Sequence, residues 1–123
     1  MINLRQLEIS KHYQRDNQFR EKIINQIVNN NWGQIIKIEW HKGTYRCLTD
    51  MGLIFILTPE QDKIMTYYLA RARVVQGMFR GNAPKFILKR VHRNASKYEK
   101  ICGVNFLDSK THELYVKGVL YEE

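Results

Sequence analysis

The sequence predicts an α+β fold, with one domain over residues 1–123 in which an N-terminal helix packs on a four-stranded antiparallel sheet. The hydrophobic spacing changes after Gly33, from the three- and four-residue intervals of a helix to the alternation of strands. Short turn-forming stretches then divide residues 35–69 at intervals typical of a meander. Hydrophobic residues make up 44% and charged residues 26%, which excludes a disordered chain.

The first helix is predicted upstream of Gly33 by five apolar residues spaced as one helical face. They are Phe19, Ile23, Ile24, Ile27 and Val28. Asp16 or Asn17 is placed to cap the start of this helix, and the asparagines at 29–31 are placed to end it. Before it, the apolar residues at positions 4–9 indicate a short strand.

Four strands are expected next, each bounded by turn residues. They cover residues 35–40, Thr44–Thr49, Leu53–Leu57 and residues 64–69. The connecting turns at 41–43, 50–52 and 59–62 are short, which favours antiparallel pairing of consecutive strands. Because Leu53–Leu57 is apolar without interruption, it is expected to be a central strand covered on both faces.

Two helices and a closing hairpin are predicted after the sheet. A short helix is expected over residues 71–80, and Pro84 is suited to the first position of a longer one. In the longer helix Ile87, Val91, Ala95 and Tyr98 form an apolar stripe, and Lys85, Lys89, Arg93 and Lys97 form a basic stripe. Residues 104–121 are interpreted as the hairpin, and Phe79 and Phe86 are expected in the core.

The net charge is concentrated in one segment. Twenty Lys and Arg against twelve Asp and Glu give +8, and residues 71–100 alone hold nine basic residues and one acid, Glu99. A local excess of this kind attracts polyanions, so we expect nucleic acid or a nucleoprotein as partner. The candidate binding residues are Arg71, Arg73, Arg80, Lys85, Lys89, Arg90, Arg93 and Lys97. The alternative is a solvated basic face that only aids solubility.

No sequence motif indicates base-specific recognition, a metal site or a cofactor. Helix-turn-helix, zinc-finger, glycine-rich phosphate-loop and RNA-recognition signatures are absent, so contact with the phosphate backbone is favoured. Cys47 and Cys102 form no CxxC pair and are expected to be buried thiols. The longest apolar run has five residues, Leu53–Leu57, so we expect no membrane association and a cytoplasmic location.

A few positions resemble a family of small nucleases. The stretch I-S-K-H-Y at residues 9–13, Arg20, the apolar strand Leu53–Leu57 and T-Y-Y at residues 66–68 are similar to the superfamily of barnase, EndoU, colicin-type ribonucleases and RelE toxins. The likeness covers about the first 70 residues and is greatest to prophage-borne members. It implies metal-independent RNA cleavage, with His12 as acid or base, Arg20 on the phosphate, and Thr66 and Tyr68 beside the scissile bond.

Three functions therefore remain open at the level of sequence. The first is a nucleic-acid-binding domain of phage or mobile-element type without catalytic activity. The second is a metal-independent ribonuclease, for example a toxin. The third is a phage-encoded inhibitor that binds a host nucleoprotein such as a defence nuclease. We favour the first, because the whole net charge lies within residues 71–100.

Overall fold

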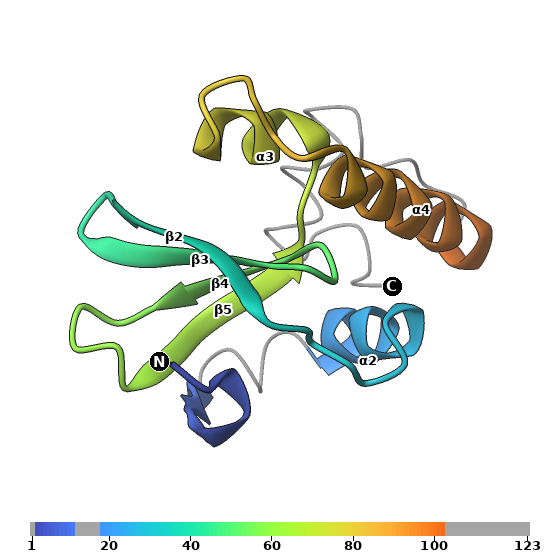
Figure 1. Cartoon of the computed structure of the whole chain (residues 1–123). Helices are drawn as coiled ribbons and strands as arrows, with labels where there is room; N and C mark the ends of the chain where they lie inside the picture. The colour runs from blue at the N-terminus through green and yellow to red at the C-terminus, as the bar shows by residue number, and fades with distance from the viewer. Residues whose placement is uncertain (1, 12–17, 103–123) are drawn as a thin grey trace.

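The computed structural model of the chain describes residues 2–11 and 18–102, and it confirms the α+β class (Figure 1). The elements in chain order are η1 (Leu4–Gln6), β1 (Glu8–Ile9), α2 (Gln18–Ile27), β2 (Ile35–His41), β3 (Thr44–Thr49), β4 (Leu53–Leu57), β5 (Lys63–Leu69), α3 (Ala72–Met78) and α4 (Lys85–Cys102). The predicted closing hairpin, His12 and the predicted helix cap at Asp16 or Asn17 lie outside the described residues.

The sheet has five strands and is mixed, so the prediction of four antiparallel strands was wrong in detail. Its order is β1-β5-β4-β3-β2, and β1 pairs in parallel with β5 while the other pairs are antiparallel. Strand β1 has two residues, which is too short for an alternation pattern. Its partner is also distant in sequence, because Glu8 lies opposite Lys63. The local hydrophobic pattern therefore does not predict the pairing of β1 with β5.

The β2–β3 hairpin has a two-residue turn rather than the predicted three-residue turn at 41–43. His41 belongs to β2 and lies opposite Thr44, and the turn consists of Lys42 and Gly43. Both turn residues have positive φ, 51° at Lys42 and 81° at Gly43. Two consecutive left-handed residues match the right-handed twist of a hairpin, so the strands continue in pairing up to the turn.

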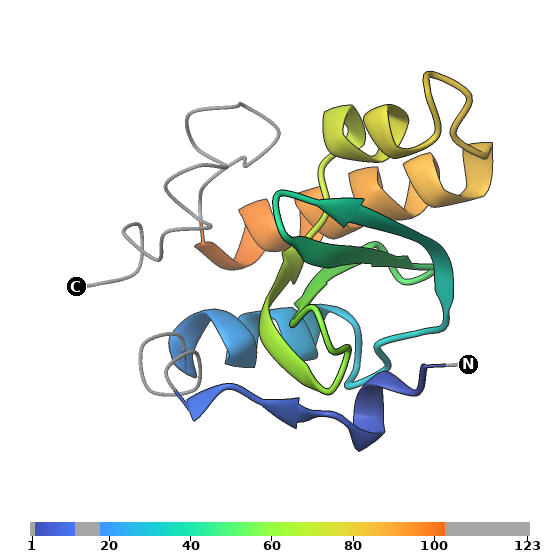
Figure 2. The ribbon, with the colours of Figure 1, turned by 90° about the vertical axis from the view of Figure 1, so that its left-hand side faces the viewer.

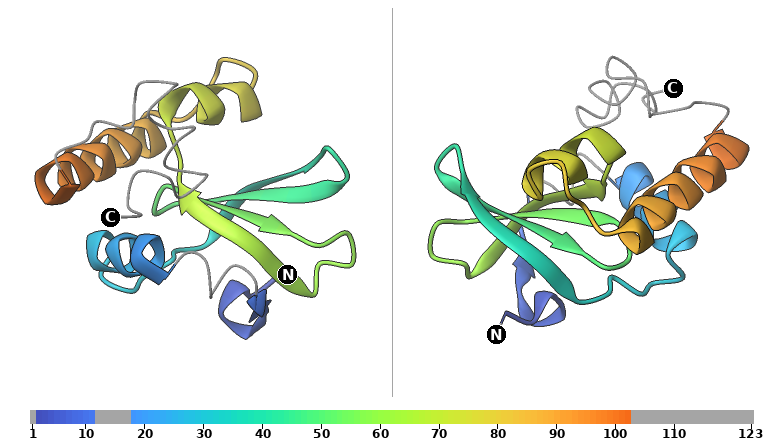
Figure 3. Two further views of the ribbon diagram at one scale, coloured as in Figure 1. Left: turned by 180° about the vertical axis from the view of Figure 1, so that it is seen from behind. Right: turned by 45° about the horizontal axis from the view of Figure 1, so that its top comes forward.

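Helices cover both faces of the sheet (Figure 2). Helix α2 packs through Ile23, Ile24 and Ile27 on the face that carries Phe55 and Leu57. On the other face, α3 and the first half of α4 cover the side chains of Leu48 and Ile54. Helix α4 runs past the end of the sheet at which β5 ends (Figure 3, left), and its second half contributes Ala95 and Tyr98 to the α2 side. The predicted apolar stripe of α4 is therefore confirmed.

Three aromatic rings form the centre of the core on the α2 side. Phe55 and Tyr67 stack with ring centroids 4.9 Å apart, and Trp32 lies 5.1 Å from Phe55 and 5.3 Å from Tyr67. Asn25 of α2 accepts a hydrogen bond from Trp32 Nε1 at 2.9 Å and donates one to Tyr67 Oη at 3.2 Å. These bonds satisfy the polar atoms of two buried aromatic side chains and join α2 to β5.

The prediction that Phe86 belongs to the core was wrong. Its side chain is 55% exposed, whereas Phe79 packs against the cluster of Leu48 and Ile54 as expected. Phe86 precedes Ile87 in α4, and Ile87 is the residue of that turn that faces the sheet. Successive residues of a helix point about 100° apart, so the ring of Phe86 is directed away from the core.

Burial controls the chemistry of the Cys47 thiol. Its side chain is 0% exposed on β3, and burial raises the thiol pKa from 9.0 to about 11. We expect the folded protein to resist alkylation of Cys47 at neutral pH, because a buried neutral thiol is a poor nucleophile. Peptide mapping after iodoacetamide treatment should show modification of Cys47 only after unfolding.

The same shift has a consequence for stability at alkaline pH. The pKa of Cys47 is higher in the folded protein than in the unfolded chain. Its contribution to the free energy of unfolding is therefore fully present below pH 9.0 and is lost as the pH rises through about 11. Rapid labelling of Cys47 in the native protein at neutral pH would contradict the burial on which both expectations depend.

Candidate functional site

Five cations line the outer side of α4, and we call them the α4 basic surface. They are Lys85, Lys89, Arg90, Arg93 and Lys97. Lys85, Lys89 and Arg93 are exposed, and Arg90 and Lys97 are half-buried. None of the five forms an ion pair with another described residue. No described carboxylate therefore forms an ion pair with these five cations, although Asp50 lies beside three of them.

The position of this surface is determined by the contact between α4 and the turn from β3 to β4. Asn94 Nδ2 donates a hydrogen bond to Met51 O at 2.8 Å. A Cβ atom at Gly52 would lie 2.7 Å from Asn94 Nδ2, and the φ of Gly52 is +79°. Glycine therefore allows this close approach of turn and helix. As a result, Asp50 at the start of the turn lies beside the cations of α4.

A pocket of about 240 Å³ lies at this junction. Its lining consists of Asp50, Phe86, Lys89, Arg90 and Arg93. Asp50 Oδ1 accepts a hydrogen bond from the backbone N–H of Gln34 at 2.9 Å, which fixes the orientation of the carboxylate. The pocket thus combines an exposed aromatic ring, three cations and one oriented carboxylate. Sequence reasoning missed Asp50 and Phe86 here, because the pocket forms only when the turn packs on α4.

The remaining cations predicted to bind nucleic acid lie elsewhere. Arg73 of α3 and Arg80 after it are exposed, and neither lines the α4 pocket. Arg71 precedes α3 and acts electrostatically on Tyr68 of β5. The basic residues expected as one group therefore lie on two helices and beside them: five form the α4 basic surface, Arg71 acts on Tyr68, and Arg73 and Arg80 lie on or next to α3.

Three of the four predicted catalytic positions can be placed, and they lie together. Arg20 of α2 is 3% exposed, and its guanidinium donates a hydrogen bond to Thr66 Oγ1 on β5 at 3.0 Å. Arg20 also acts electrostatically on Tyr68, two residues after Thr66. The fourth position, His12, lies outside the described residues.

Arg46 of β3 belongs to the same group and was missed in the sequence. It lies opposite Ile56, which in turn lies opposite Thr66, so the three side chains form one row across the sheet. Arg46 Nε donates to Glu39 Oε1 of β2 at 2.8 Å. The sequence contained one indication of this pair. Glu39 and Arg46 are register partners in the hairpin, and an arginine opposite a glutamate favours an ion pair between neighbouring strands.

The Tyr68 hydroxyl is held in its neutral form. Burial raises the pKa of Tyr68 above its ordinary value of 10.0, while the charges of Arg46, Arg20 and Arg71 act in the opposite direction. The phenol is therefore protonated at neutral pH and can donate a hydrogen bond. Three guanidinium groups thus act on this phenol, and that of Arg46 is also ion-paired with Glu39.

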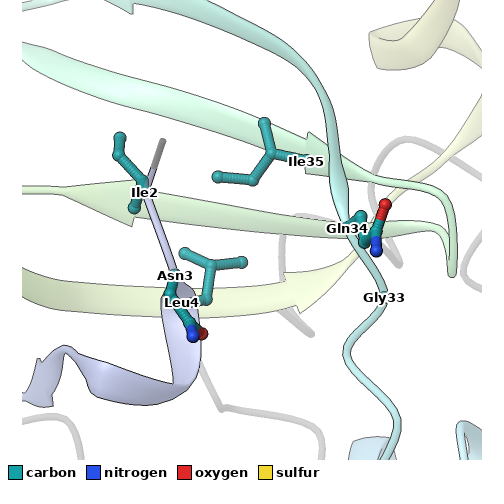
Figure 4. Close-up of a pocket in the computed structure, with 6 residues that line it drawn as sticks. All are labelled: Ile2, Asn3, Leu4, Gly33, Gln34 and Ile35. Carbon is teal, nitrogen blue, oxygen red and sulfur yellow. The ribbon is translucent and has the colours of Figure 1, made fainter.

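A second pocket lacks charged residues. It has a volume of about 330 Å³ and lies between the N-terminal segment and the start of β2 (Figure 4). Its lining comprises Ile2, Asn3, Leu4, Gly33, Gln34 and Ile35, none of which is charged. Among the described residues no group of three or more His, Cys, Asp or Glu is arranged to hold a metal ion.

Comparison with known proteins gives no assignment. No protein-family model, no curated protein and no solved structure matches the chain. No helix among residues 2–11 and 18–102 combines the length and apolar character needed to span a membrane.

Proposed function

We propose that the protein binds the phosphate backbone of nucleic acid through the α4 basic surface. The observation that supports this proposal is the row of cations from Lys85 to Lys97 that has no ion-pair partner among the described residues. The row extends for about 18 Å along the helix, which is enough to contact several successive phosphates of one strand.

The test is the dependence of affinity on salt. Fluorescently labelled single-stranded RNA and DNA are titrated with the protein at increasing salt concentration. With three to five phosphates neutralised, we expect the logarithm of the affinity to fall linearly with the logarithm of salt, with a slope of about −2 to −4. No measurable binding at low salt, or an affinity that does not change with salt, would overturn the proposal.

A second candidate function, metal-independent cleavage of RNA, is favoured by the group around Tyr68. In this reaction the 2′-oxygen attacks the adjacent phosphorus and the 5′-oxygen leaves with a proton. Tyr68 is protonated and suited to supply that proton, while Arg20 and Arg46 suit the charge that develops on the phosphate. The family resemblance implies His12 as acid or base, and with Tyr68 as the acid His12 would remove the 2′-hydroxyl proton.

Replacing Tyr68 with Phe tests this second function. If the protein cleaves RNA in the presence of a chelator, Tyr68→Phe should lower the rate by about 100-fold or more, since a general acid contributes at least that much. Tyr45→Phe is the matched control, because Tyr45 packs against Trp40 with ring centroids 5.0 Å apart, and its side chain points to the opposite face of β3 from that of Arg46. Equal rates for wild type and Tyr68→Phe, or no cleavage of any RNA, would exclude this role for Tyr68.

A further inference from the structure

We infer that the pocket at Asp50 and Phe86 holds one unpaired base of a single-stranded nucleic acid and prefers a base that carries an amino group. This inference rests on the proposed function. The sequence predicted contact only with the phosphate backbone, and the inference adds contact with a base. The pocket lies on the same side of α4 as the cations, because Phe86, Lys89, Arg90 and Arg93 recur at three- and four-residue intervals.

Phe86 supplies the stacking surface. A phenylalanine that is 55% exposed in the middle of a basic surface contributes little to folding, and its ring lines a pocket of about 240 Å³. A single pyrimidine ring fits this volume. Stacking of a base on an aromatic side chain contributes about 1–3 kcal/mol per base and requires a base that is not paired in a duplex.

Asp50 determines what the pocket accepts. A carboxylate repels phosphate, so the interior of the pocket is unsuited to the backbone, and Lys89 and Arg93 are left to contact the flanking phosphates. Because Asp50 Oδ1 accepts from the Gln34 N–H, the carboxylate is held in one orientation, and among the described residues none donates a hydrogen bond to Oδ2. A carboxylate accepts hydrogen bonds from the N4 amino group of cytosine, whereas uracil presents the O4 acceptor at that position.

The experiment compares oligocytidylate with oligouridylate of equal length, which differ in the group at C4 and in the proton at N3 but have the same backbone and ring size. Wild-type protein should bind oligocytidylate about tenfold more tightly, the effect of one well-placed hydrogen bond to a base edge. In Asp50→Asn the amide can still accept from Gln34 and can also donate to O4. This variant should therefore bind oligouridylate more tightly than wild type does, and the preference for cytosine should be lost.

Other results of this comparison separate the two proposals. Equal binding of the two oligonucleotides by wild type, with the salt dependence intact, would overturn the base pocket and leave backbone binding in place. An equal rise in affinity for both in Asp50→Asn would also overturn it, because Asp50 would then act only by repelling phosphate. Absence of binding to either oligonucleotide would reject the proposed function itself.

A second variant tests stacking independently of Asp50. Phe86→Leu retains an apolar side chain without the aromatic ring and should weaken binding of single strands by about tenfold. Binding of duplex with the same backbone length should not change. Ile38→Ala, at a side chain of β2 that is 40% exposed, is the matched control. Loss of duplex and single-strand affinity to the same extent in Phe86→Leu would contradict the inference.

Discussion

Charge reversal at Lys89 and Arg93 is expected to weaken nucleic-acid binding by about 100-fold at low salt. The slope of log affinity against log salt should also become less negative, by about one to two. Both side chains are exposed and line the same pocket, so the change affects the surface without disturbing the core. Arg90 is left in place, because it is half-buried and its side chain packs against the turn at Gly52. Titration of labelled single-stranded RNA with Lys89→Glu/Arg93→Glu measures the effect.

The matched control is a double reversal at Lys22 and Lys63. Both lysines are exposed, they lie on α2 and at the start of β5, and neither lines the α4 pocket. The control changes the net charge by the same amount, so any difference between the two variants reports the position of the charge. We expect the control to lose only a small part of the affinity. An equal loss in both variants would mean that overall charge, and not the α4 basic surface, controls binding.

Replacing Phe55 with Ala is expected to destabilise the protein by about 3–5 kcal/mol. The Phe55 side chain is 0% exposed and stacks on Tyr67, with Trp32 against it, so its removal leaves a cavity that rigid aromatic neighbours fill poorly. Urea denaturation followed by circular dichroism measures the change in the free energy of unfolding.

Phe86→Ala provides the comparison within the same measurement. Its ring is 55% exposed, so we expect a change in the free energy of unfolding within about 0.5 kcal/mol. The two variants delete the same side chain and differ only in its burial. Similar destabilisation by both would show that Phe86 belongs to the core after all and would remove the aromatic surface from the α4 pocket.

The elements that local periodicity specifies were predicted correctly. Helix α4 begins at Lys85, one residue after the start predicted at Pro84, and its buried residues recur at helical spacing up to Tyr98 as expected. The unbroken apolar segment Leu53–Leu57 is the central strand β4, with four of its five residues buried. Such features depend on spacing along the chain, which a single sequence contains.

The features that were missed depend on contacts between distant segments. The short strand expected within residues 4–9 is present as β1, but its parallel pairing with β5 joins Glu8 and Ile9 to residues more than fifty positions later. Asp50 meets α4 because Gly52 allows the turn to approach Asn94 closely. Arg46 joins Thr66 through the register of three strands. None of these contacts has a local pattern, so periodicity cannot predict them.

In the candidate site, too, local spacing predicted some features, whereas others depend on contacts between distant segments. The proximity of Arg20 to Thr66 and Tyr68 was expected from a resemblance and not from spacing, and the structure brings these side chains together. The basic residues were treated as one group because they share one stretch of sequence. In the fold Arg71 lies near Tyr68, whereas Lys89 and Arg93 lie at the pocket on α4.

The central claim is that the outer side of α4 is the surface that contacts nucleic acid, and a residue-resolved titration tests it most directly. Backbone amide spectra of the isotopically labelled protein are recorded while a short oligocytidylate is added. We expect the largest changes in amide chemical shift along α4 from Lys85 to Lys97 and at Asp50, with smaller changes on β2 and α2. Shifts confined to the residues around Tyr68, with α4 unchanged, would contradict the claim.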